Sequence, residues 1–186
     1  MKILMLCDRE SALTGSLQDG FQSLLAGAGH DVASVTLSRE DFKPCLGCFG
    51  CWVKTPGRCV AQNDGANCIA EKQMNSDAVL LLTKITYGGF SADIKSYLDR
   101  SIQNIASDFE VYKGEMRHKM RYTRFPAWIA LGYGDASEAE RQTFAHLTQR
   151  NALNMRPDKF LSLTIKSEGT HEEAGRSILE FLEEGI

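Results

Sequence analysis

The sequence lacks long hydrophobic runs and any excess of positive charge. Its 186 residues include 21 Lys and Arg against 24 Asp and Glu, which gives a formal net charge of −3. No apolar run approaches the ~18 residues that a membrane-spanning helix needs. The apolar start of the chain ends at Asp8, too soon for the core of a signal peptide. Nothing here favours a membrane or a nucleic acid as partner, and we expect a cytoplasmic protein.

Proline, histidine and several familiar motifs are also scarce or missing. The chain has four Pro and four His, and the histidines show no metal-ligand spacing. No Ser/His/Asp set is recognisable. Neither G-x-G-x-x-G nor a P-loop occurs, so the sequence does not indicate dinucleotide or nucleoside triphosphate binding of those classes. With 43% hydrophobic residues and no low-complexity tract, the chain is not of the disordered kind.

Short apolar runs alternate with segments of helical periodicity. This alternation predicts one domain over residues 1–186, an α/β fold whose five-stranded parallel sheet is covered by helices on both faces. The expected strand order is 2-1-3-4-5. The expected strands are Ile3–Cys7, Val32–Leu37, Ala78–Thr83, Ala127–Leu131 and Phe160–Ile165.

The segments between the strands differ in character. Lys43 to Gln73 is predicted to be irregular, and Ile94 to Ile105 to be helical. A second helix is expected over Ser137–Asn151. Ile105 to Phe125 is long for a simple connection, whose median is ~4–6 residues.

Ligands of open parallel sheets bind beyond the carboxyl ends of the strands, where three loops are expected to meet. The first loop, Asp8–Ser16, precedes a helix whose free N–H groups and dipole favour a phosphate. The alternative is that a hydroxyl of this loop only caps the helix. Its candidate phosphate ligands are Arg9, Ser11, Thr14 and Ser16.

The second and third loops are suited to a flat aromatic ring. Tyr87 offers a ring face, and Gly88 and Gly89 let a ligand approach the backbone closely. A simple turn is the alternative interpretation. The third loop follows the fourth strand as Gly132-Tyr133-Gly134-Asp135.

Two segments resemble a known family. TKITYGGFSADIKSYLDR resembles the motif P-x-Y-x-x-x-x-S-x-x-x-K-x-x-L-D-R of the NADPH-dependent FMN reductase family. PCLGCFGCWVKTPGRCVAQND resembles the cysteine-bearing segment of many flavodoxin-like members of that family, including the iron–sulfur flavoproteins. Together the segments span residues 44–100. The positions that match the second half of the motif are Ser91, Lys95, Leu98, Asp99 and Arg100.

The resemblance implies a flavodoxin-like three-layer fold that binds FMN. It also implies an enzyme that takes hydride from NAD(P)H and passes electrons to a small-molecule acceptor such as a quinone or a flavin. Because the flavin does the chemistry, we expect no catalytic acid or base of the chain itself. The implied cofactor-binding residues are Arg9, Ser11, Thr14, Ser16, Thr83, Ile85, Tyr87, Gly88, Gly89, Gly132, Tyr133 and Gly134.

Two other classes of function stay open. The first is an electron-transfer protein, an iron–sulfur flavoprotein or a flavodoxin-type carrier, without direct NAD(P)H turnover. The second is a regulatory module that keeps the fold without a cofactor.

The chain departs from the family pattern at two places. Cys7-Asp8-Arg9-Glu10 stands where the family has G-S-P-R, and its acidic residues repel a phosphate unless Arg9 and the helix N-terminus offset them. Lys84 takes the place of the family proline, and Tyr87 lies one residue after the family tyrosine.

Four of the six cysteines lie within fifteen residues. In a reducing compartment such clustering indicates metal or redox work before structural disulfides. Three interpretations stay open: packing residues without metal, a 4Fe–4S cluster, and zinc or a redox disulfide. The long gap before the last cysteine leads us to favour the first and to expect FMN without iron. The candidate ligands are Cys45, Cys48, Cys51 and Cys59.

The connection from Ile105 to Phe125 carries a run of basic residues. We expect it to help form a homodimer, which the resemblance also implies, and to cover the site. The run is either a solvated loop or a contact for the extra phosphate of NADPH or for a partner subunit. Its members are Lys113, Arg117, His118, Lys119, Arg121 and Arg124.

Overall fold

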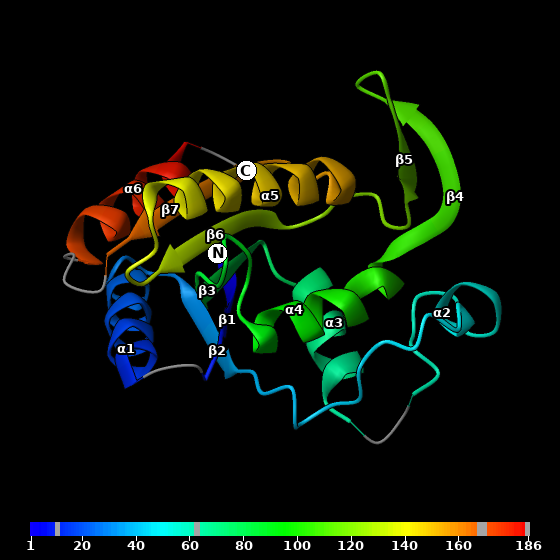
Figure 1. Cartoon of the computed structure of the whole chain (residues 1–186), viewed down its shortest axis with the longest axis horizontal. Coiled ribbons are helices and arrows are strands. Elements are labelled where there is room, and N and C mark those ends of the chain that lie inside the picture. Colours follow the sequence, from blue (N-terminus) through cyan, green and yellow to red (C-terminus); the bar gives the residue numbers. More distant parts are fainter. Residues whose placement is uncertain (10–11, 62–63, 167–170, 185–186) are drawn as a thin grey trace.

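A computed structural model describes residues 1–9, 12–61, 64–166 and 171–184. Five parallel strands form one sheet in the order β2-β1-β3-β6-β7, and a two-stranded antiparallel hairpin, β4-β5, stands apart from it (Figure 1). Since the hairpin is not part of this sheet, β6 and β7 are its fourth and fifth strands in chain order, and the expected order is confirmed. The strands of the sheet are β1 Lys2–Cys7, β2 Asp31–Thr36, β3 Ala78–Lys84, β6 Ala127–Tyr133 and β7 Phe160–Ile165.

Hydrophobic side chains fill both faces of the sheet. Because successive residues of a strand point to opposite faces, Ile3 and Met5 of β1 join one core, whereas Leu4 and Leu6 join the other. The first core is closed by α1 (Ala12–Gly27) and α6 (His171–Glu183). The second is closed by α3 (Ala66–Met74), α4 (Ala92–Arg100) and α5 (Glu138–Met155). The result is the three-layer arrangement that the sequence predicts.

Two helices on the second face begin at serine caps. Ser91 accepts a hydrogen bond from the backbone N–H of Ile94 at the start of α4. Ser137 and Glu140 form a capping box at the start of α5. These caps fix where each helix leaves the loop that follows its strand.

The predicted helix through Ile105 is wrong at its C-terminal end. α4 stops at Arg100, a 3₁₀ turn follows over Ser101–Asn104, and Ile105 begins β4. The Trp52 indole N–H donates to the carbonyls of Ile102 and Ile105 at 3.2 and 3.1 Å. A side chain fifty residues away thus binds carbonyls at the point where the helical pattern breaks.

The long connection is a β-hairpin. β4 (Ile105–Tyr112) and β5 (Glu115–Met120) pair through the two-residue turn Lys113-Gly114. Both turn residues have positive φ, 51° and 77°, which suits a tight hairpin of the primed type. Figure 1 shows the hairpin projecting away from the main sheet.

The segment from Lys43 to Gln73 is only partly irregular. It contains the short helix α2 (Gly50–Val53), and its end forms α3, which the sequence pattern missed. Within the described ranges, no helix is both long and apolar enough to cross a membrane.

Candidate functional site

The carboxyl ends of β1, β3 and β6 are joined through one buried carboxylate. Asp8 follows β1 and is fully buried. It accepts hydrogen bonds from the Tyr133 hydroxyl at 2.6 Å, the Lys84 backbone N–H at 2.6 Å and the Thr14 hydroxyl at 3.1 Å. Three loops that are far apart in sequence are therefore held together at one edge of the sheet. Sequence reasoning treated Asp8 only as a source of repulsion.

Asp93 ties the same region to β2. Its carboxylate accepts hydrogen bonds from the backbone N–H of Arg9 at 3.1 Å and from that of Arg39 at 2.9 Å. Asp93 lies in the first turn of α4 and is buried. It occupies a variable position of the family motif, so no sequence pattern indicates this role.

The first predicted loop presents one cation. The Arg9 side chain is exposed and lies 3.3 Å from Asp41. Thr14 is buried, and its hydroxyl donates to Asp8 beside the Tyr133 hydroxyl. Ser16 is exposed on α1, and Ser11 lies outside the described residues. Of the four candidate phosphate ligands, Arg9 lies at the end of β1. The Thr14 hydroxyl is instead part of the buried hydrogen-bond network around Asp8.

The second predicted loop is a tight turn closed by its own backbone. Thr86 and Gly89 exchange hydrogen bonds of 3.0 and 2.9 Å. Gly88 has φ of +75°, and a Cβ there would lie 2.7 Å from Thr143 Cβ of α5. The absence of a side chain at Gly88 therefore allows close packing against α5, and the approach of a ligand to this turn stays a prediction. Thr83 accepts a hydrogen bond from the Ser91 backbone N–H, and Ile85 is buried.

Tyr87 differs from the rest of this turn in its strained backbone and its exposed side chain. Its φ is +51°, a left-handed conformation that costs a residue with a side chain ~1–2 kcal/mol. Tyr87 is 93% exposed. The free protein thus holds a large aromatic ring in water on a strained backbone, beside the ends of β1 and β6. Strain of this kind is typical of ligand sites.

The third predicted loop begins later than the sequence indicated. Gly132 and Tyr133 belong to β6, and both are buried. A Cβ at Gly132 would lie 2.7 Å from the Ile85 side chain, so this glycine allows close packing of β6 on the second loop. Gly134 has φ of +114°, which requires glycine, and its carbonyl accepts a hydrogen bond from Arg141 at 3.1 Å.

The four clustered cysteines meet at one cavity. A hollow of about 260 Å³ is lined by all four thiol-bearing residues together with Arg100 and Ile102. Cys51 is buried, Cys59 is half-buried, and Cys45 and Cys48 are exposed. Burial first, and then the neighbouring thiols, raise the pKa of Cys51. The other two cysteines lie elsewhere: Cys68 is exposed on α3, and Cys7 is buried in β1, where burial raises its pKa to about 12.

The cavity depends on a loop of unusual backbone geometry. Gly47 and Phe49 have positive φ of 63° and 56° and fold the first three cysteines into a tight turn. The Phe49 ring stacks on Trp52 with centroids 5.2 Å apart. Trp52 in turn contacts His118 of the hairpin. Among the residues that the structure describes, no three His, Cys, Asp or Glu side chains converge on a position for a single metal ion.

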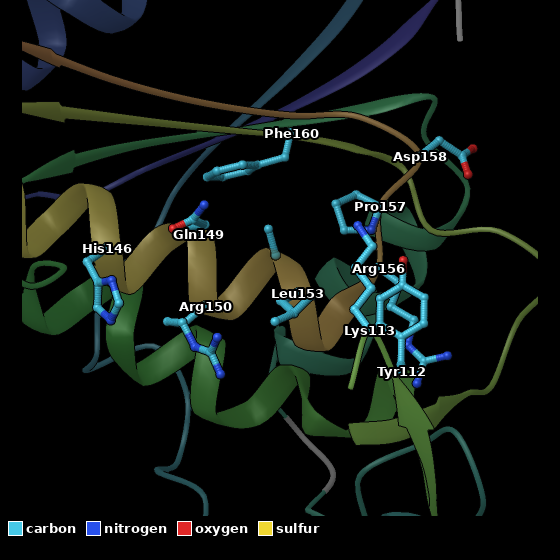
Figure 2. A pocket seen from close by; sticks show the side chains of 11 residues that line it. Tyr112, Lys113, His146, Gln149, Arg150, Leu153, Arg156, Pro157, Asp158 and Phe160 are labelled. Carbon is cyan, nitrogen blue, oxygen red and sulfur yellow. The ribbon is translucent and has the colours of Figure 1, made fainter. Parts of the chain in front are cut away.

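A larger cavity of about 460 Å³ lies between the hairpin turn and the second half of α5 (Figure 2). Two of its arginines bind the hairpin: Arg150 pairs with Glu115, and Arg156 pairs with Glu110 and stacks on Tyr112. The cavity borders Phe160, where β7 begins. It therefore lies at the amino ends of the strands, opposite the edge where ligands of such sheets bind.

The basic run of the hairpin also makes internal contacts. Arg121 donates to the Gln103 carbonyl at 3.0 Å, and Arg124 pairs with Asp77 at 3.1 Å. His118 packs on the Phe109 ring. The run is thus partly structural.

The sequence shows partial similarity to one known protein. No protein-family model matches the chain. A stretch of 77 residues, 41% of the chain, is 31% identical to an iron–sulfur flavoprotein of Methanocaldococcus jannaschii and spans 38% of that protein's length.

Solved structures match over nearly the whole chain. An azoreductase from Bacillus anthracis superposes with a TM-score of 0.65 at 15% identity, over 99% of this chain and 96% of that one. An NAD(P)H:quinone oxidoreductase from Methanothermobacter marburgensis gives 0.64 at 14% identity, over 96% and 89%. An NADH:FMN oxidoreductase gives 0.59 at 16% identity, over 97% and 87%. At these identities the likeness shows the fold, and the flavodoxin-like architecture is confirmed.

Proposed function

We propose that the protein is an FMN-dependent NAD(P)H oxidoreductase that passes electrons to a small-molecule acceptor such as a quinone or a flavin. The observation that carries the proposal is Tyr87, an exposed ring on a strained turn at the carboxyl end of β3. The ends of β1 and β6 lie beside it through the Asp8 network. The fold it shares with the azoreductase and the two oxidoreductases supports the same function.

The residues fit a flavin mononucleotide. The Tyr87 ring would position the isoalloxazine, and the turn from Ile85 to Gly89 would line it. Arg9 and the N-terminus of α1 would hold the single phosphate, while the hydrogen bonds to Asp8 hold its negative charge inside the fold. When bound, the flavin would supply the transfer of hydride and electrons. The chain's own task is to hold the ring at the sheet edge and control access to it.

The test is anaerobic purification followed by a visible spectrum and chromatography of the released flavin. We expect stoichiometric FMN, bleaching by NADPH or NADH, and recovery of the colour on addition of a quinone. Mainly FAD would contradict the assignment of the phosphate loop. Bound flavin that neither nucleotide bleaches would indicate a flavodoxin-type carrier, and a chain that takes up no flavin would be a regulatory module.

A second candidate is an iron–sulfur flavoprotein with the same flavin site. The cysteine cavity favours it, because all four clustered cysteines line one hollow. This geometry argues against our expectation of mere packing residues. The matched segment of the archaeal iron–sulfur flavoprotein adds support. The four cysteines would hold a 4Fe–4S cluster, which supplies one-electron transfer when bound.

Helix α4 connects the two sites in this second candidate. Asp93 in its first turn holds the first loop, and Arg100 at its end lines the cysteine cavity. Seven residues of helix separate them by ~10 Å along the axis. Iron and acid-labile sulfide assays on anaerobic protein test the cluster. Replacing any one cysteine of the cavity with serine should remove iron and leave FMN bound; iron-free wild-type protein after reconstitution would eliminate this candidate.

We also propose that the protein is a homodimer. The hairpin carries three exposed apolar side chains, Phe109, Val111 and Met116, on an arm that projects from the sheet. Such side chains on a projecting arm are suited to contact with a second copy of the chain.

A further inference from the structure

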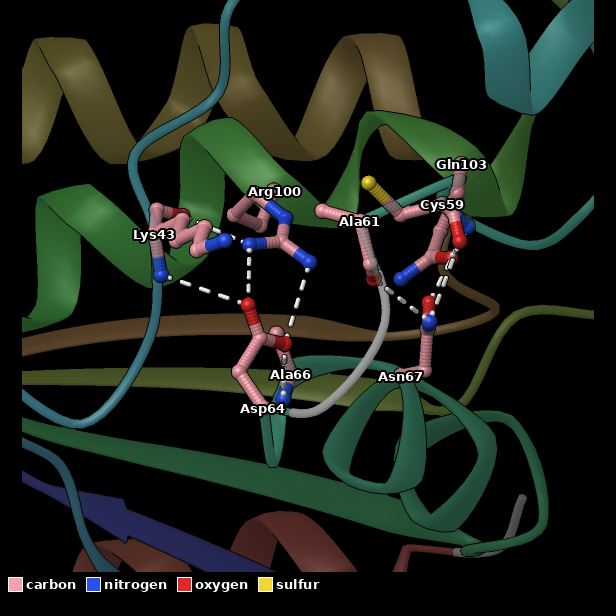
Figure 3. A network of polar contacts seen from close by, with 8 residues as sticks. All are labelled: Lys43, Cys59, Ala61, Asp64, Ala66, Asn67, Arg100 and Gln103. Atoms are coloured by element: carbon pink, nitrogen blue, oxygen red, sulfur yellow. Dashed lines mark hydrogen bonds and ion pairs between the residues drawn. The ribbon is translucent and has the colours of Figure 1, made fainter.

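A buried arginine lies beside the cysteine cavity. The side chains of Arg100 and Asp64 are 1% and 6% exposed. Two guanidinium nitrogens donate to the two Asp64 oxygens at 2.9 and 3.2 Å, and one also donates to the Lys43 carbonyl (Figure 3). The guanidinium is therefore fixed on one side by a bidentate pair, which orients it rigidly.

The backbone of the neighbouring Cys59 is also held by hydrogen bonds. The Cys59 backbone N–H donates to Asn67 at 3.0 Å and to Gln103 at 2.6 Å. The Asn67 amide returns hydrogen bonds to the carbonyls of Cys59 and Ala61. Figure 3 shows this network next to the Arg100–Asp64 pair. The thiol of Cys59 is thus held at a defined place on the cavity wall.

Two buried N–H groups near this wall have no acceptor among the described residues: Arg100 Nε and Gln103 Nε2. An unpaired buried donor destabilises the folded state, and more so when it is charged. Arg100 lines the cavity, and Gln103 binds the backbone of Cys59. Arg100 borders the cysteine cavity, where an electron-rich group would accept from its Nε, whereas Gln103 lines a neighbouring hollow with Asn67.

The charges around the cysteine cavity also favour an electron-rich group there. One carboxylate already balances Arg100, whereas the cavity can present four thiolates. Arg100 is the buried cation of the cavity lining; the other, Lys43, is exposed. A cation and N–H donors next to cluster sulfur favour the more negative, reduced state.

We propose that Arg100 is a positioning residue for an iron–sulfur cluster in the cysteine cavity, where its fixed guanidinium raises the reduction potential of that cluster. The inference rests on the proposed cluster. It goes further because it assigns the tuning of the potential to one ion pair of this chain.

The test compares midpoint potentials in anaerobic redox titrations followed by electron paramagnetic resonance. The double variant Arg100→Gln/Asp64→Asn removes both charges and leaves no unpaired buried carboxylate. We expect its ratio of reduced to oxidised cluster at a fixed potential to fall about tenfold, a shift of ~59 mV for one electron. Arg100→Lys keeps the charge and should recover part of the shift.

A matched control lies on the same helix. Lys95 and Asp99 form an exposed ion pair at 2.5 Å, and Lys95→Gln/Asp99→Asn should leave the potential unchanged because water screens it. Iron content, flavin content and circular dichroism are measured on every variant. Loss of iron from the Arg100 variant with flavin and fold intact also supports the proposal. If the double variant keeps its iron and its potential is unchanged, the role of Arg100 is refuted and the cluster stands. If the wild-type protein contains no iron, the cluster itself is refuted.

Discussion

The Tyr133 hydroxyl donates a hydrogen bond to Asp8 over 2.6 Å, deep in the protein, and so links the end of β6 to the end of β1. Because both groups are fully buried, neither can exchange this bond for one with bulk water.

Tyr133→Phe should therefore destabilise the fold. Asp8 would lose one of its donors in a place that water does not reach, which costs ~1–3 kcal/mol. Urea unfolding followed by circular dichroism measures the free energy of unfolding. Tyr122→Phe, at an exposed tyrosine, is the control and should change nothing. Equal stability of wild type and Tyr133→Phe would show that Asp8 does not depend on this hydroxyl.

Tyr87→Gly should weaken flavin binding without destabilising the free protein. Glycine removes the ring and also relieves the positive φ of 51°. We expect FMN to bind about 10-fold more weakly, in keeping with an aromatic contact of ~0.5–1.5 kcal/mol plus its buried area. Fluorescence titration of the flavin-free protein gives the Kd. The site would lie elsewhere if the variant bound FMN as tightly as wild type.

Charging the outer face of the hairpin should dissociate the dimer. Val111 and Met116 are cross-strand partners and are 70% and 64% exposed. Val111→Glu/Met116→Lys places opposite charges across the pair, which preserves the hairpin itself. Sedimentation at micromolar concentration should shift from dimer to monomer. The apolar pair Val111→Thr/Met116→Leu should still dimerise, and a monomeric wild type would refute the proposal.

Asp77 should make the stability of the fold depend on pH in the acid range. The hydrogen bond from the Lys2 backbone N–H, and after it the Arg124 guanidinium, lower the pKa of Asp77. A lowered pKa in the folded state stabilises the protein above the unfolded value of ~4, and this contribution is lost as the pH falls through the folded pKa.

The stability gap between wild type and Asp77→Asn should therefore be widest near neutral pH and close as the pH falls below ~4. Urea unfolding at pH 7, 5 and 3 measures it. In protein that also carries Arg124→Gln, Asp77→Asn should still lower the free energy of unfolding at pH 7, but by less than in wild type. Part of the effect remains because the Lys2 hydrogen bond remains. A gap that is constant over this range would contradict the prediction.

Some site residues were predicted from the sequence but do different work in the structure. Tyr133 was assigned to a flavin loop and lies in the core, because the hydrogen bond to Asp8 draws the end of β6 inward. Gly88 is predicted to let a ligand approach, and the structure adds a packing role, because Thr143 of α5 lies where a Cβ would be. Asp93 was not singled out at all. Each depends on a partner far away in the chain, and local pattern carries no information about such partners.

The layers of this protein were predictable from the pattern of apolar and helical segments along the chain. Apolar runs such as Ala78–Thr83 predicted the strands, since a strand buried on both faces is apolar along nearly its whole length. The spacing of the cysteines left three interpretations open, and only the structure brings the four residues to one cavity. The end of α4 depends on a contact from a distant part of the chain, because the Trp52 indole binds the carbonyls of Ile102 and Ile105. The position of Arg100 beside the cysteines also depends on a distant residue, because the ion pair with Asp64 holds the buried guanidinium there.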